Sequence, residues 1–184
     1  MMATTHVFVG LAAVAPVAYV APELAAPLAV GAVCGGIAPD LDVAFEHRRT
    51  LHFPVYGVVP AALAAAVAAL TPSTLAVGLA AFAVVAWLHA ASDALGGGPE
   101  FDPWAAPREE AVYDHARGRW VRPRRWIRYD GAPEDVGAVV VFAIPAVVVF
   151  DGWVHLVVAA GVAVSLAYAL VRRRLPEWAP DWVE

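Results

Sequence analysis

Uninterrupted apolar runs dominate this sequence and restrict the architectures open to it. They cover residues 7–21, 24–39, 54–71, 74–95, 136–150 and 153–171, and hydrophobic residues make up 61% of the 184. A membrane crossing needs about 20 apolar residues, with a lower limit near 17. The third, fourth and sixth runs satisfy this requirement, whereas the other three are short enough to be tilted or only partly inserted. We predict an all-α, polytopic membrane bundle of about six short transmembrane helices.

The runs organise the chain as one membrane domain over residues 1–184. Turn-forming residues at 22–23, 71–73 and 151–152 favour antiparallel neighbours. Residues 1–95 form a predicted four-helix unit, 96–135 a polar cytoplasmic segment, 136–171 a helical hairpin and 172–184 a tail. Because residues 1–6 carry no basic side chain, we expect the first run to be a retained helix rather than a signal peptide. Residues 110–129 are predicted to fold as a hairpin that turns at Gly118.

The basic residues predict the topology. All 12 are arginines, and six crossings place every one of them on the face that also receives both termini. The opposite face receives Glu23, residues 71–74 and Asp151, and no arginine. The positive-inside rule then puts both termini in the cytoplasm, in an inner or plasma membrane. The net charge of −5 argues against a nucleic-acid partner, and the single Cys34 excludes a disulfide framework.

Acidic and histidine side chains gather on the arginine-rich face. The set comprises His6, Asp40, Asp42, His47, His52, His89 and Asp93. His89 and Asp93 are four residues apart and therefore share one face of a helix. Imidazole nitrogens and carboxylate oxygens are ligands for Zn²⁺, Mn²⁺ or Fe²⁺, and such an ion can supply a hydroxide nucleophile near neutral pH. We therefore predict a divalent metal site with one or two ions, Zn or Mn.

Each member also has a plainer interpretation. His89 and Asp93 could be a hydrogen-bonded pair between helices, and Asp40 and Asp42 could cap a helix and complete a turn. The histidines near the helix ends could lie at the membrane interface. The joint placement on one face favours the metal site. We expect its ligand atoms to lie within about 8 Å of one another, because each ligand bond is about 2 Å long.

The same residues carry a resemblance to a known family. His6 and Gly10, the stretch 39–42 (Pro-Asp-Leu-Asp), His47-Arg48 with His52, and His89-x-x-x-Asp93 with Gly97 and Pro103 resemble the YdjM-like family. This family is described as LexA-regulated, inner-membrane-associated, predicted metal-dependent hydrolases. The resemblance covers roughly residues 1–105. The chain departs from the family's pattern at Arg49, at Leu51 and Phe53 around the second histidine, and at Gly96.

The resemblance and the residues together predict a membrane-embedded metal-dependent hydrolase that acts on phosphoesters or lipid headgroups. The expected ligands are Asp40, Asp42, His52, His89 and Asp93. His47 and His6 are further ligands or a general acid and base, and Arg48 and Arg49 are expected to orient a phosphate group. Two alternatives stay open: a metal-ion carrier, which needs polar residues through the bundle, and a non-catalytic protein with a buried polar network.

Overall fold

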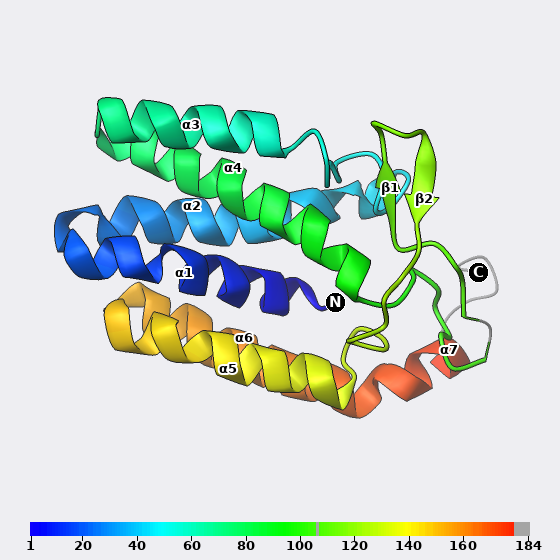
Figure 1. The fold of residues 1–184 in the computed structure, drawn as a ribbon. Coiled ribbons are helices and arrows are strands. Elements are labelled where there is room, and N and C mark those ends of the chain that lie inside the picture. The colour runs from blue at the N-terminus through cyan, green and yellow to red at the C-terminus, as the bar shows by residue number, and fades with distance from the viewer. Residues whose placement is uncertain (106, 179–184) are drawn as a thin grey trace.

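The computed structural model describes residues 1–105 and 107–178, and these residues fold as a bundle of apolar helices (Figure 1). The helices are α1 (Ala3–Val20), α2 (Ala25–Ile37), α3 (Val58–Leu70), α4 (Thr74–Ser92), α5 (Pro133–Val149), α6 (Trp153–Val171) and the short α7 (Leu175–Trp178). Single 3₁₀ segments adjoin them: η1 (Pro22–Leu24), η2 (Ala38–Ala44), η3 (Asp93–Leu95) and η4 (Arg172–Arg174). The predicted all-α bundle is confirmed. Of the predicted tail at 172–184, residues 179–184 lie outside the described part.

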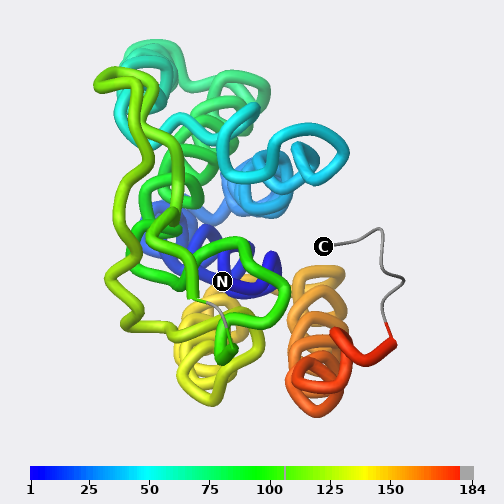
Figure 2. Tube along the Cα trace, turned by 90° about the vertical axis from the view of Figure 1, so that its right-hand side faces the viewer, coloured from blue at the N-terminus to red at the C-terminus, as the bar shows by residue number. Residues whose placement is uncertain are grey.

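Helix α1 occupies the middle of the bundle. It packs against α2 on one side and α5 on the other, while α4 packs against both α2 and α3 (Figures 1 and 2). Tight connections join antiparallel neighbours at the three predicted turns. Ser73 caps α4 by accepting a hydrogen bond from the Ala76 N–H at 3.2 Å, and Gly152 adopts a φ of 62° between α5 and α6.

Within the described part of the chain, four helical segments are long and apolar enough to cross a membrane. With their 3₁₀ extensions they cover Ala3–Val20, Pro22–Ala44, Thr74–Leu95 and Trp153–Trp178. The first two runs therefore form longer helical segments than expected, the second because η1 and η2 extend α2 at both ends. The expectation that the third run easily spans a membrane was wrong, because α3 has 13 residues and rises only about 20 Å. Residues 54–57 form turns instead of helix, closed by a 2.9 Å hydrogen bond from the Gly57 N–H to the Phe53 carbonyl.

Small residues allow α2 and α4 to approach closely. A methyl group added at Gly31 would overlap the Gly78 carbonyl oxygen, and one at Gly35 would overlap the Phe82 carbonyl oxygen. Such contacts replace the hydrophobic driving force that helices lack in lipid. The contact brings the end of α2, and with it η2, next to the end of α4.

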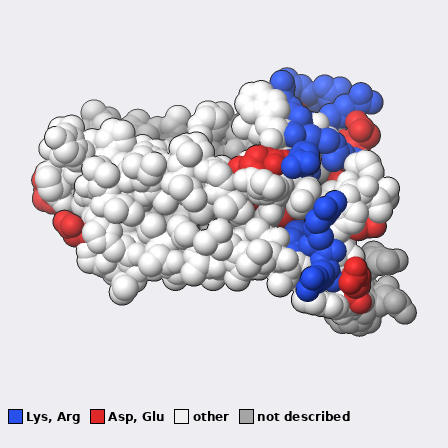
Figure 3. All heavy atoms as spheres, turned by 90° about the horizontal axis from the view of Figure 1, so that it is seen from below, with Lys and Arg blue, Asp and Glu red and all other residues white. Residues whose placement is uncertain are grey.

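The outer surface of the bundle is apolar along most of its length. Val20, Leu70, Leu75 and Leu170 are each more than 70% exposed, as expected for side chains that face lipid. Figure 3 shows the charged residues gathered at one end, with a few acidic residues at the other. The arginines are residues 48 and 49, seven residues within 108–128, and residues 172–174. The basic residues gather at one end of the bundle, so the predicted one-sided distribution is confirmed (Figure 3).

A short hairpin and a buried carboxylate organise the arginine-rich end. Strands β1 (Val112–Asp114) and β2 (Arg119–Val121) pair antiparallel, and Gly118 has a φ of 63° at the predicted turn. Asp135, in the first turn of α5, is fully buried. It accepts hydrogen bonds from the Met2 N–H at 2.9 Å, the Thr5 hydroxyl at 2.6 Å and the Gly131 N–H at 3.0 Å. This carboxylate fixes the start of α1 against α5.

Candidate metal centre

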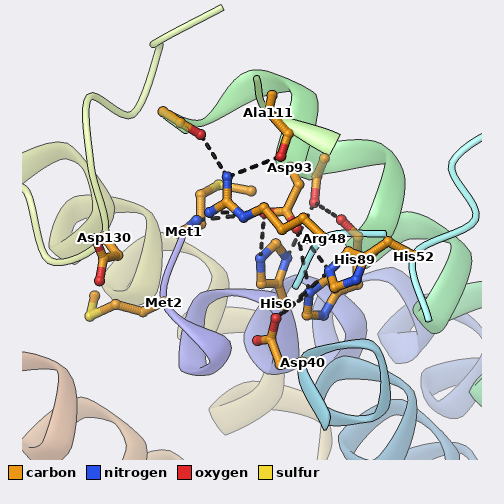
Figure 4. Close-up of polar contacts among 12 residues, drawn as sticks. Met1, Met2, His6, Asp40, Arg48, His52, His89, Asp93, Ala111 and Asp130 are labelled. Atoms are coloured by element: carbon orange, nitrogen blue, oxygen red, sulfur yellow. Dashed lines mark hydrogen bonds and ion pairs between the residues drawn. The ribbon is translucent and has the colours of Figure 1, made fainter. Parts of the chain in front are cut away.

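Five side chains from separate parts of the chain meet at the arginine-rich end of the bundle (Figure 4). His6 comes from α1, Asp40 from η2, His52 from the loop before α3, and His89 and Asp93 from the end of α4 and the start of η3. Close packing of α1, α2 and α4 places these segments together. The structure thus brings together five of the seven residues predicted for a metal centre at one point.

The Nε2 atoms of the three histidines face the two carboxylates. His6 Nε2 lies 3.3 Å from Asp93 Oδ1, His52 Nε2 lies 3.2 Å from Asp93 Oδ2, and His89 Nε2 lies 3.2 Å from Asp40 Oδ1. Two sets, His6–His89–Asp93 and Asp40–His52–His89, each keep their ligand atoms within 4.8 Å of one another. The predicted proximity is therefore confirmed.

Each histidine is held through its other ring nitrogen. His52 Nδ1 lies 2.9 Å from Asp42 Oδ2, His89 Nδ1 lies 2.8 Å from the Gly36 carbonyl oxygen, and His6 Nδ1 lies 3.3 Å from Ser92 Oγ. The Ser92 hydroxyl already donates to the His89 carbonyl, so it accepts from His6. An imidazole that donates from Nδ1 presents a lone pair on Nε2. All three free lone pairs then point into one space.

These inward-facing atoms are buried, and no group among residues 1–105 and 107–178 forms a hydrogen bond of good geometry with them. They are the Nε2 atoms of His6, His52 and His89 and both carboxylate oxygens of Asp93. Buried polar atoms without partners cost free energy, and polar groups in membrane helices are rare for the same reason. Five such atoms in one place, with hydrogen bonds that fix each ring from outside, form an arrangement that could hold a metal ion.

The electrostatics of the cluster favour a cation. Burial by itself lowers the pKa of His52, but the negative charges of Asp93 and Asp42 and the hydrogen bond to Asp42 outweigh it and raise that pKa above 6.5. The rings of His6 and His89 stack at 3.6 Å between centroids, so protonation of both would place two like charges in contact. A bound cation satisfies the carboxylates without charging either of the stacked rings.

Asp42 and His47 lie behind the inward-facing atoms. Asp42 is fully buried, and its oxygens accept from His52, from the Leu51 N–H at 3.1 Å and from His47 Nδ1 at 2.8 Å. Its position is therefore that of a group that orients His52. The His47 side chain is 32% exposed and packs edge-on against the His52 ring.

The two neighbouring arginines have different surroundings. Arg48 is buried and adopts a φ of 60°, and its Nη1 donates to the Gly97 carbonyl at 2.6 Å while Nη2 lies 3.8 Å from Asp93. Arg49 points away from the cluster, where it pairs with Glu46 at 2.5 Å and covers the Tyr113 ring. Of these two arginines, only Arg48 contributes charge to the cluster.

A pocket of about 340 Å³ adjoins the cluster. Asp40, His47 and Arg48 line it on one side, and Glu100 and Arg172 line it on another. Asp40 is the ligand candidate with access to this space, since its side chain is 26% exposed and that of Asp93 is 1%. The pocket therefore lies between Asp40 of the cluster and Arg172 of η4.

Several residues that shape the centre could not be singled out from the sequence. Gly36 contributes a main-chain oxygen, and Ser92 is one hydroxyl within an apolar helix. For Asp135 the sequence offered one weak indication of a structural role: it is an acidic residue in the first turn of a helix that begins with proline. The remaining histidines lie elsewhere: His155 bonds to the Val147 carbonyl at the far end, and His115 to the Arg49 carbonyl.

Comparisons of the chain with protein-family models, with curated proteins and with solved structures find no match.

Proposed function

We propose that the protein binds one divalent metal ion through His6, His52, His89, Asp93 and Asp40. The convergence of three buried, unpartnered Nε2 atoms on two carboxylates is the observation that carries this proposal. Nitrogen and oxygen donors without sulfur suit Zn²⁺ or Mn²⁺. One ion is favoured over two because both ligand sets share His89, and its free nitrogen can bind a single ion.

We further propose that the centre is hydrolytic and acts on a phosphoester, including the headgroup of a membrane lipid. A bound Zn²⁺ or Mn²⁺ supplies Lewis acidity and a deprotonated water near neutral pH. The adjoining pocket admits a headgroup-sized substrate next to Asp40. His47 is exposed to this pocket and can carry a proton, while Asp42 holds it in place.

Membership of the YdjM-like family and a cytoplasmic site are parts of the same proposal. The residues that suggest the family are those of the cluster, and the one-sided arginines support cytoplasmic termini. The carrier alternative is less well supported. Among the described residues, the middles of α1, α2 and α4 present Ala, Val, Leu and Gly, and the unpartnered polar atoms are confined to one end.

Metal content tests the proposal directly. The full chain is purified in detergent, loaded with Zn²⁺ or Mn²⁺, desalted and measured by elemental analysis. We expect about one equivalent in the wild type and near none in His89→Ala or His52→Ala. His155→Ala is the matched control, because this histidine is exposed at the other end of the bundle.

Hydrolytic activity is then measured on two phosphodiester substrates, bis(p-nitrophenyl) phosphate and phospholipid in mixed micelles. Metal-dependent turnover that His47→Ala reduces without loss of bound metal supports the hydrolase. Stoichiometric metal with no turnover of any phosphoester contradicts the enzyme and leaves a metal-binding membrane protein. Absence of metal in the wild type contradicts the centre itself and favours the polar network.

A further inference from the structure

A second pocket, of about 480 Å³, lies at the arginine-rich end away from the metal centre. It is formed by the polar segment, the start of α5 and η4, and contains none of the candidate ligands. Its lining residues are Pro103, Trp104, Pro107, Arg125, Arg128, Tyr129, Pro133 and Arg173. Three guanidinium groups and two aromatic rings therefore share one concave surface.

The charges of this pocket are only partly balanced. Arg128 pairs with Glu134 at 2.7 Å, and Arg125 lies 3.5 Å from Glu100. Within residues 1–105 and 107–178, Arg173 forms no ion pair and stands 5.5 Å from the centre of the Trp104 ring. A guanidinium group held on an aromatic face keeps its donors available to an anion.

The pocket also lies next to the ends of two apolar helices. Helix α6 ends at Val171 and α5 begins at Pro133, so the pocket adjoins the boundary between apolar helices and polar chain. Trp126 and Trp178 at the same end are 68% and 60% exposed, as is typical of the aromatic belt of membrane proteins. A ligand anchored in the bilayer can thus present its polar part here.

We propose that this pocket binds the phosphate-bearing headgroup of an anionic membrane lipid. Arginine donors match phosphate oxygens, and Trp104 and Tyr129, whose rings meet edge-on at 5.5 Å, provide a rigid wall for the headgroup. The acyl chains lie along the exposed apolar surface of α5 and α6, where Val148 is 74% exposed and Leu170 83% exposed. The site does not depend on the metal centre.

Native mass spectrometry of the delipidated full chain in detergent tests the proposal. Phosphatidylglycerol, phosphatidylcholine and inorganic phosphate are titrated separately. We expect phosphatidylglycerol to bind in preference to phosphatidylcholine, and Arg173→Gln to weaken its binding about tenfold. Arg122→Gln is the matched control, because Arg122 is 84% exposed and pairs with Glu109 outside the pocket. Bound metal is expected to be equal in all three proteins.

Three results would overturn the proposal. Equal binding of phosphatidylglycerol and phosphatidylcholine would show that the headgroup charge is not recognised. Equal losses in the Arg173 and Arg122 variants would indicate diffuse attraction to the arginine-rich end rather than a pocket. Inorganic phosphate that binds as tightly as the lipid would identify a site for free phosphate. A folding defect in Arg173→Gln is recognised by a lower metal content, and Trp104→Leu then replaces it, with the same expected loss.

Discussion

Replacement of Asp42 by asparagine distinguishes a metal ligand from a residue that orients one. Oδ2 of Asp42 accepts from His52 Nδ1 at 2.9 Å and from the Leu51 N–H at 3.1 Å, and Oδ1 lies 2.8 Å from His47 Nδ1. An asparagine oxygen in the place of Oδ2 keeps the first two bonds. Its amide group then faces His47, which can accept in its other tautomer, while the Arg48 N–H, 3.4 Å from Oδ1, loses a weak acceptor. The variant thus removes a charge behind His52 with little change in volume.

The magnitude follows from the change of acceptor. A hydrogen bond to a charged group contributes about 1.5–3 kcal/mol and a neutral one about 0.5–1.5 kcal/mol. The bond that fixes His52 therefore weakens by about 1.25 kcal/mol, the difference between the midpoints of these ranges, which is nearly tenfold in metal affinity. Partners that orient metal-binding histidines affect affinity by about 10- to 100-fold when mutated. The expected loss is at the lower end because the hydrogen bond itself survives.

Competition with a fluorescent chelator measures this affinity in detergent. We expect Asp42→Asn to bind a full equivalent of Zn²⁺ at saturation with a Kd raised about tenfold. Asp114→Asn is the control, because Asp114 is buried in the hairpin outside the cluster. No binding at saturation would make Asp42 a ligand, and a Kd within about twofold of the wild type would show that it does not orient His52.

Three further predictions concern the scaffold. Gly31→Ala pushes α2 away from α4 and should lower the free energy of unfolding by about 1–3 kcal/mol, measured by thermal unfolding. Gly137→Ala is the control and should leave the stability unchanged, because the space around Gly137 is open. Asp135→Asn weakens the hydrogen bonds that hold the start of α1, and should lower both the stability, measured by unfolding, and the metal affinity, measured by chelator competition. A loss of stability with unchanged metal affinity would contradict the idea that Asp135 positions His6. Hydrogen bonds from Arg117 and from main-chain N–H groups lower the pKa of Asp114, so its contribution to the hairpin is present above pH 3.8 and is lost as the pH falls below it. Amide exchange of residues 112–121, corrected for intrinsic rates, should therefore accelerate below about pH 4 in the wild type but not in Asp114→Asn.

The sequence predicted the bundle because lipid imposes simple requirements on length and apolarity. It also placed His89 and Asp93 together, since helical periodicity decides their common face. It failed for the length of α3, because proline and glycine near residues 54–57 turned part of an apolar run into a loop. Composition alone cannot distinguish an apolar run that is helical throughout from one that begins with a turn.

Loop residues show why the details of the centre were harder to foresee. Arg48 and Arg49 are adjacent and chemically alike, yet the positive φ of Arg48 turns its side chain inward and leaves Arg49 outside. Asp42 was expected to be a ligand together with Asp40, because both lie in the stretch 39–42 on the arginine-rich face. In the structure its oxygens are occupied by His52, His47 and the main chain, while Asp40 faces the Nε2 atoms. Only three-dimensional packing decides which carboxylate points inward.

The C-terminal helices belong to the centre as much as the four that carry its side chains. His6 has its place because α1 starts where Asp135 of α5 holds Met2 and Thr5, and because Ser92 of α4 accepts from its ring. Without these contacts the stacked pair of His6 and His89 would lose one member, and His6 Nε2 would no longer lie 3.3 Å from Asp93 Oδ1. A site assembled from α1, η2, α4 and a loop therefore depends on the whole bundle. Each of the five inward-facing polar atoms alone would favour water over a buried position. The packing of the whole bundle holds them together at one point.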